Sequence, residues 1–204
     1  MRLYSGTAEQ FVYDTTQNQI ADKLRIAFEN YYGHTVSPNE FASWTNSFQF
    51  LKTAIESNDL KENMMILEYE LPYSSKRIDC MLFGSGSEGQ NVLLVELKQW
   101  SKTDPSEING NIVTFIGGAP RLHPHPALQV KEYGQMLLDF VETFNEKPEI
   151  SLSACVYLHN YVRQISDPLF TTQYMTLIKE FPLFTKSDFN DKLGLPIDKT
   201  KHQF

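Results

Sequence analysis

Cysteine is scarce in this chain of 204 residues, which contains only Cys80 and Cys155. Both lie inside strand-like apolar runs, so the sequence predicts buried thiols in a reducing cytosol and no disulfide framework. Long apolar runs are also missing, because no stretch approaches the roughly 18 consecutive apolar residues of a membrane helix. No apolar run follows Arg2, as it would in a signal peptide. We therefore expect a cytoplasmic protein that does not associate with membranes.

Basic residues are outnumbered, with 18 Lys and Arg against 25 Asp and Glu, for a formal net charge of -7. This balance argues against a protein that coats nucleic acid non-specifically, since phosphate binding depends on Lys and Arg. It leaves open an enzyme with a basic rim around a metal-charged cleft. The candidate rim residues, for which an ordinary solvated surface is the alternative, are Lys98, Lys102, Arg121, His123, His125 and Lys131.

Apolar residues make up 41% of the chain and aromatic residues 13%, which is enough for a folded core and excludes disordered and coiled-coil classes. No repeat or linker divides the sequence. We expect a single domain over residues 1–204, with a helical part at 1–60, a core at 65–160 and an aromatic-rich tail at 161–204. The tail residues expected to pack as short helices are Phe170, Tyr174, Phe181, Phe184 and Phe189.

Helical spacing dominates the N-terminal third, first in the run from Ile20 to Phe28. A second helix is predicted after Ser37, which can act as its cap, while Pro38 suits the first turn and Glu40 completes a capping box. Its expected buried stripe consists of Phe41, Trp44, Phe48, Leu51 and Ile55.

The middle of the chain changes to short aliphatic runs at residues 65–71, 77–83 and 92–97, separated by turn residues, which predicts an antiparallel meander. A helix over 126–144 follows, and then a strand over 151–158, which a helical crossover makes parallel to a strand of the sheet. The sequence therefore predicts an α/β fold with a central mixed four-stranded sheet flanked by helices. The inward residues expected on the crossover helix are Val130, Tyr133, Leu137, Leu138 and Val141.

Two patterns look like known sites but lack the context that those sites need. Residues 84–89 match the letters G-x-G-x-x-G, yet a strand follows instead of the helix that would bind pyrophosphate, so we expect a hairpin loop. His123, His125 and His159 lack further ligands at recognisable spacing, so no zinc site is expected.

Charged residues interrupt two strands that otherwise look buried. Glu96 follows four apolar residues, and Lys98 leaves the same face about 6.6 Å further along the strand. Asp79 interrupts the preceding strand and can come level with Glu96 across the hairpin. Two desolvated carboxylates repel each other unless a cation is present, and oxygen ligands suit Mg²⁺ or Mn²⁺. The alternative is a buried cluster satisfied as ion pairs.

Asp79, followed after sixteen residues by Glu96-Leu97-Lys98, resembles the motif of the PD-(D/E)XK nuclease superfamily, although Ile78 stands where that motif has proline. The superfamily core has a helix, three strands, a helix and a fourth strand, and the resemblance therefore implies a restriction-endonuclease-like core. It also implies that Asp79, Glu96 and the Leu97 carbonyl bind Mg²⁺, with Lys98 activating the attacking water. Glu68 is a candidate third acid, with an edge-strand charge as the alternative.

Gln129 and Tyr133 lie one helical turn apart and resemble the Gln-x-x-x-Tyr motif of RecB-like members. The resemblance implies that Gln129 supports the water or the substrate phosphate and that Tyr133 lines the cleft. A solvated glutamine and a core tyrosine are the alternatives. Lys102, Arg121 and Lys131 are candidate contacts to backbone phosphates, without sequence readout.

Longer phrases at residues 68–72, 76–79, 95–101, 125–133 and 157–161 resemble the N-terminal region of bacterial Schlafen group 3-like DNA/RNA helicases. In that family a nuclease-like domain precedes a P-loop motor, whereas this chain lacks G-x-x-x-x-G-K-[ST] and cannot hydrolyse ATP by that mechanism. We expect a Mg²⁺- or Mn²⁺-dependent nuclease acting on DNA more than on RNA, with a helicase motor as partner in cis or in trans. The rival is a non-catalytic nucleic-acid-binding or docking module, and a role in phage defence is compatible with either.

Overall fold

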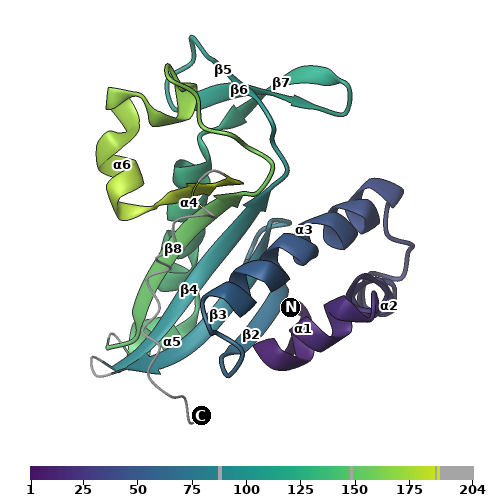
Figure 1. Cartoon of the computed structure of the whole chain (residues 1–204). Helices are drawn as coiled ribbons and strands as arrows, with labels where there is room; N and C mark the ends of the chain where they lie inside the picture. The colour runs from purple at the N-terminus through teal and green to yellow at the C-terminus, as the bar shows by residue number, and fades with distance from the viewer. Residues whose placement is uncertain (87–88, 148, 187, 189–204) are drawn as a thin grey trace.

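The computed structural model describes residues 1–86, 89–147, 149–186 and 188 (Figure 1). Within these residues a mixed sheet of six strands, in the order β1-β2-β3-β4-β8-β9, carries helices on both faces, which confirms the predicted α/β class. Its strands are β1 (Arg2–Thr7), β2 (Met64–Glu70), β3 (Arg77–Gly86), β4 (Gly89–Lys98), β8 (Ser151–Leu158) and β9 (Leu183–Thr185).

A second, three-stranded sheet lies beyond one end of the large sheet, at the top of Figure 1. Its strands are β5 (Thr103–Pro105), β6 (Asn111–Ile116) and β7 (Ala119–Pro124). The helices are α1 (Ala8–Thr16), α2 (Ile20–Tyr32), α3 (Pro38–Ser57), α4 (Pro126–Phe140), α5 (Glu142–Glu146) and α6 (Met175–Glu180), with short 3-10 turns η1 (Pro168–Phe170) and η2 (Thr172–Tyr174). In the described part of the chain, none of the helices has both the length and the hydrophobicity that a membrane crossing requires.

The predicted meander and crossover strand are confirmed. Strands β2, β3 and β4 pair antiparallel in chain order, and β8 lies parallel to β4. The hairpin between β3 and β4 closes with Gly86 paired to Gly89, so the strands extend further into the glycine-rich segment than predicted. The edge strands β1 and β9 widen the predicted four-stranded sheet to six.

Helix α3 begins as predicted, with the Ser37 hydroxyl accepting a hydrogen bond from the Glu40 amide at 3.2 Å. The predicted capping box is not completed, because the Glu40 carboxylate pairs with Arg77 on β3 instead. Most of the predicted stripe is buried, whereas Phe41 is only partly buried.

Helix α4 ends at Phe140, four residues before the predicted end, because the backbone of Val141 is extended. A separate short helix, α5, follows. The predicted inward residues of α4 are buried except Leu138, which is 41% exposed, and Val141 is only partly buried. The prediction that Leu138 faces inward is wrong, because successive helical residues are about 100° apart and Leu138 turns from the buried Leu137 toward solvent.

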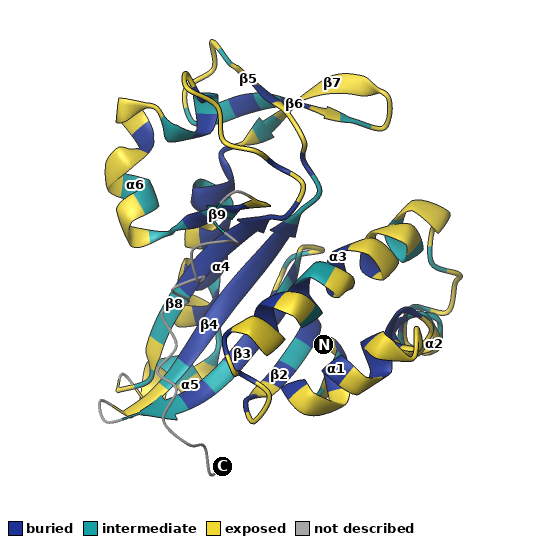
Figure 2. Ribbon diagram, in the orientation of Figure 1, coloured by how far each residue is buried: buried dark blue, intermediate teal, exposed yellow. Residues whose placement is uncertain are grey.

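Two apolar cores lie on opposite faces of the large sheet. The strands of this sheet are among the most buried parts of the molecule (Figure 2). One core packs α1, α2 and α3 against the sheet, and the other packs α4. Cys80 and Cys155 are buried free thiols, as predicted.

The three-stranded sheet and the tail add buried residues to the core under α4. The β6–β7 hairpin turns at Gly117 and Gly118, which both have positive φ, and its two strands were not predicted. The tail forms η1, η2 and α6, as predicted, but Phe184 lies in strand β9. Phe189 lies outside the described residues.

Candidate functional site

Strand β2 is irregular at Glu68, whose φ of 53° lies in the left-handed region. In a regular strand Leu67 and Tyr69 would face the same side of the sheet. Here Leu67 belongs to the core under α3, whereas Tyr69 packs against the core under α4. A left-handed conformation at a non-glycine residue costs on the order of 1–3 kcal/mol and tends to occur at functional sites.

Strand β3 is irregular at the position opposite Glu68. Cys80 packs in the core under α3 and Ile78 in the core under α4, so this strand also changes faces, at Asp79. The ladder between β3 and β4 ends with the pair Cys80–Val95. Its next positions in register are Asp79 and Glu96, and the two strands part there.

The opening between these strands and α3 is a cavity of about 180 Å³. It brings together every residue that the sequence predicted as a metal ligand, together with the predicted lysine. The residues that line it are Ser43, Trp44, Ser47, Phe48, Glu68, Asp79, Glu96, Leu97 and Lys98. The proposed ligands therefore share one small chamber at the ends of the strands.

Glu96 is 5% exposed and has one satisfied and one unsatisfied carboxylate oxygen. Its Oε1 accepts hydrogen bonds from Lys98 Nζ at 2.8 Å and from Gln129 Nε2 at 2.7 Å. Its Oε2 is buried and has no hydrogen-bond partner among the described residues. A buried carboxylate oxygen without a donor is costly, so this atom is suited to a cation.

Asp79 is held by the backbone of the neighbouring strand, because its Oδ2 accepts a hydrogen bond from the Leu97 amide at 2.6 Å. Burial, followed by the charge of Glu96, raises the pKa of Asp79 from 3.8 to about 8, against the opposing effects of Lys98 and of the Leu97 hydrogen bond. The cavity thus holds more carboxylate than its own cations neutralise. It can relieve the excess by binding either a proton or a metal ion.

Glu68 lines the same cavity but is engaged by Arg77, whose Nε lies 2.7 Å from Glu68 Oε2. Arg77 also pairs with Glu40 on α3. Burial and the charge of Asp79 raise the pKa of Glu68 well above its ordinary value, whereas the guanidinium and a hydrogen bond from Trp44 favour the ionised form. In this arrangement Glu68 ties β2 to β3 and, through Arg77, to α3.

Replacing Arg77 by methionine is expected to lower the free energy of unfolding by about 3 kcal/mol, because Glu68 loses its cation inside the protein. Urea unfolding of the metal-free protein measures this. The double variant Arg77→Met/Glu68→Gln should recover most of the loss, since it removes the unpaired charge. Arg25→Met, which breaks exposed ion pairs on α2, is the control and should change stability by about 0–1 kcal/mol. Equal effects of the Arg77 and Arg25 substitutions would contradict this role of Arg77.

Gln129 and Tyr133 lie behind Glu96, on the α4 side of the sheet. Gln129 Nε2 donates to both Glu96 Oε1 and the Tyr133 hydroxyl, each at 2.7 Å. Burial and the charge of Glu96 raise the pKa of Tyr133, so its hydroxyl keeps its proton. The predicted glutamine–tyrosine pair therefore joins the site as a support that orients Glu96.

The predicted phosphate contacts are not gathered at the cavity. Lys102, at the start of the small sheet, lies 3.4 Å from Asp104, and Arg121 on β7 donates to the Ile116 carbonyl. Lys131 lies on the side of α4 that faces β8 and α6, away from the cavity. None of the three lines the cavity that holds Asp79 and Glu96.

The three histidines have separate structural roles. His123 packs against Trp100. His125 caps α4 and hydrogen-bonds the Leu169 carbonyl with Nε2, and His159 Nε2 contacts the Ser47 hydroxyl.

The donor set fits a hard divalent cation. Among the described residues no three His, Cys, Asp or Glu side chains are gathered closely enough to hold an ion, and Glu68 is paired with Arg77. Two carboxylates remain, and Mg²⁺ sites in proteins commonly use one or two carboxylates with waters and substrate phosphate. Asp79, Glu96 and the Leu97 carbonyl supply oxygen only, and the unpartnered Glu96 Oε2 is an available ligand atom.

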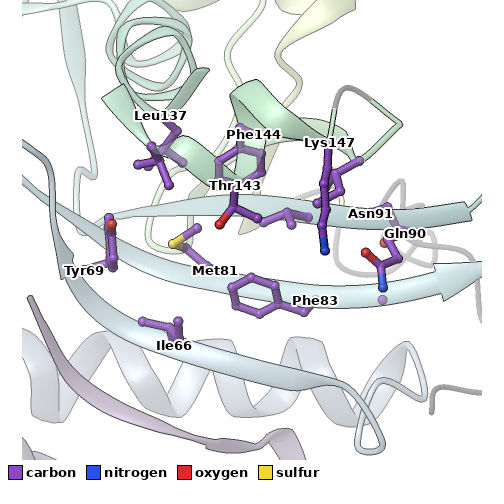
Figure 3. Close-up of a pocket in the computed structure, with 14 residues that line it drawn as sticks. Ile66, Tyr69, Met81, Phe83, Gln90, Asn91, Leu137, Thr143, Phe144 and Lys147 are labelled. Atoms are coloured by element: carbon purple, nitrogen blue, oxygen red, sulfur yellow. The ribbon is translucent and has the colours of Figure 1, made fainter. Parts of the chain in front are cut away.

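A larger cavity of about 310 Å³ lies on the opposite face, between the sheet and α4 and α5. Figure 3 shows Thr143 and Lys147 pointing toward Phe83 on β3 across its apolar interior. No carboxylate lines it among the described residues. It lacks the groups for metal-assisted hydrolysis and is not the candidate site.

Arg77 and Trp44 were not assigned to the site from the sequence. Arg77 stands two residues before Asp79, and Trp44 was expected only in the stripe of α3. The spacing of Glu40, Ser43 and Ser47 on α3 was an available signal, because it places polar residues along one helical edge beside Trp44.

The chain matches no protein-family model, no curated protein and no solved structure. The geometry of the site is therefore the main guide to what the protein does.

Proposed function

We propose that this protein is a metal-dependent nuclease that hydrolyses phosphodiester bonds in DNA or RNA. One observation carries the proposal: Asp79, Glu96 and Lys98, from two neighbouring strands, line one small cavity at the point where those strands part. Glu96 is buried, so it is not an ordinary surface charge. A buried charge with a purely structural role is normally fully paired, whereas Glu96 Oε2 has no partner among the described residues.

The order of elements supports a restriction-endonuclease-like core. Helix α3, strands β2, β3 and β4, helix α4 and strand β8 follow one another as in the PD-(D/E)XK superfamily, with β1 and β9 as additions at the edges. The resemblance to helicase N-terminal regions makes a P-loop motor, in cis or in trans, the proposed partner.

Asp79, Glu96 and the Leu97 carbonyl would hold Mg²⁺ or Mn²⁺ in this proposal. The bound ion would polarise the phosphate and make its water more acidic. Oxygen-only ligands suit both ions, and DNA remains the preferred substrate over RNA on the family resemblance alone.

Lys98 has the position of a group that acts on the reacting atoms. Its ammonium lies 2.8 Å from Glu96 Oε1 and lines the cavity, where it can orient the attacking water and neutralise charge that develops on the phosphate. Gln129 is a positioning residue, because it fixes the same oxygen of Glu96 from the other side. Trp44 and Phe48 form an apolar wall that limits access of bulk water.

The test is cleavage of labelled single-stranded, nicked and duplex substrates with Mg²⁺ or Mn²⁺. Cleavage is expected to stop on chelation and to be lost in Glu96→Gln, which keeps the shape of the side chain but removes its charge. Equal cleavage by both proteins would show a contaminating nuclease and overturn the proposal. Nucleic-acid binding without cleavage or bound metal would support the docking module in its place.

A further inference from the structure

A groove of about 450 Å³ continues from the carboxylate cavity toward the small sheet. The two share Ser43, Leu97 and Lys98, so the groove opens directly onto the proposed reaction site. One wall is α3, and the other is the β6–β7 hairpin at Phe115. In Figure 1 this hairpin and the N-terminal part of α3 stand on either side of the end of β4.

Phe115 is 61% exposed, although it is a large aromatic side chain. Phe115 lines the groove, whereas Trp100 on its floor is buried. The Lys98 ammonium lies over Trp100, 5.5 Å from the centre of the Trp100 ring. An exposed aromatic face beside a polar groove is a surface on which a planar ligand can stack. The groove thus offers one free aromatic face at its outer end and one ammonium at its inner end.

The lining of the groove carries a positive charge, whereas the whole chain is acidic. Lys98 is its one charged lining residue among the described residues, although the whole protein carries a net charge of -7. Asn39 and Asn46 on α3 present exposed amides, which can both donate and accept hydrogen bonds. A phosphate backbone could follow this groove without meeting a carboxylate before it reaches the cavity.

We infer that the groove binds single-stranded nucleic acid, with one base stacked on Phe115 and the backbone passing Lys98 into the cavity. This inference rests on the proposed function, of which it specifies the substrate. A duplex keeps the faces of its bases within its own stack, so an aromatic side chain in a groove finds a partner only when bases are unpaired. A volume of about 450 Å³ suits a small ligand such as one or two nucleotides.

The experiment measures binding of a labelled single-stranded oligonucleotide and of the matched duplex by fluorescence anisotropy. It uses Ca²⁺, which takes oxygen ligands, while cleavage with Mg²⁺ is followed separately. The wild type should bind the single strand at least roughly tenfold more tightly than the duplex, and Phe115→Leu should weaken single-strand binding by roughly tenfold, as loss of one stacked base does. Phe115→Trp should retain the affinity, because it keeps an aromatic face. Phe140→Leu is the matched control, since Phe140 is also exposed but lies at the end of α4.

Equal affinity for the two substrates, no binding of either, or equal effects of Phe115→Leu and Phe140→Leu would overturn the inference even if the protein cleaves nucleic acid. Conversely, a preference for single strands that depends on Phe115 would support it even if no cleavage occurs. The proposed nuclease function fails on the cleavage measurement alone, so the two failures are distinguishable.

Discussion

The variant Lys98→Met is expected to lose about a thousandfold in the rate of cleavage while its affinity for Mn²⁺ stays unchanged or becomes tighter. The loss follows from the position of the ammonium, which lines the cavity beside both proposed ligand carboxylates. Metal affinity is retained because Lys98 is bonded to Glu96 Oε1 at 2.8 Å and competes with an ion for that oxygen. Single-turnover cleavage and calorimetric titration on the same preparation measure the two effects.

Lys52→Met is the matched control for this substitution. Lys52 lies on the same helix, α3, that covers the cavity, but it forms an ordinary ion pair with Glu56. It should leave both the rate and the metal affinity unchanged. If Lys98→Met lowered the rate no more than Lys52→Met does, Lys98 would have no part in the reaction.

The second large effect concerns stability and pH in the absence of metal. The pKa of Asp79 is about 8 in the folded protein and 3.8 for the free side chain, so the folded state holds the proton more tightly than the unfolded state. The stability linked to this proton is complete below about pH 4 and is lost as the pH rises through about 8. Asp79→Asn, which cannot ionise, should therefore be more stable than the wild type at pH 8. The expected gain is about 2 kcal/mol, or about 4–8 °C in melting temperature.

Thermal unfolding at a series of pH values measures this difference. The advantage of Asp79→Asn should be absent near pH 4 and grow toward pH 8, where added Mn²⁺ should raise the melting temperature of the wild type and not of the variant. Asp139→Asn, on the exposed side of α4, is the control. A constant difference across the pH range would mean that Asp79 is not a desolvated carboxyl group.

The strands that carry the site were predictable because their signals are local. Aliphatic runs with turn residues between them identified β2, β3 and β4, and the helical crossover required β8 to be parallel. Asp79 and Glu96 could be paired from the sequence because a hairpin joins their strands. The alternation of side chains along a strand placed Lys98 on the same face as Glu96.

Other parts of the fold depend on contacts that no local pattern contains. Strands β5 and β7 contain few apolar residues and, within the described residues, pair only with β6, which has four apolar residues out of six. Strand β9 pairs with β8 in a part of the chain rich in aromatics, where we expected helices. The capping pattern at Ser37 was correctly read, but the carboxylate of Glu40 is taken by Arg77, 37 residues away, and no local rule anticipates that.

The cavity combines several features that do not favour stability. Glu68 has a left-handed backbone, Asp79 is a buried carboxyl group with a raised pKa, and Glu96 leaves an oxygen unpartnered. Sequences are expected to break local rules in this way mainly where function requires it. The two apolar cores on either side of the sheet can carry this local cost.

The most direct test of the metal centre is a calorimetric titration of the metal-free protein with Mn²⁺ at about pH 8, beside Glu96→Gln. We expect the wild type to show a single saturable site and to release protons on binding, because Asp79 must give up its proton to act as a ligand. The variant should show no binding. Equal binding by the two proteins, or none by the wild type, would contradict the proposal that Asp79 and Glu96 hold a divalent ion.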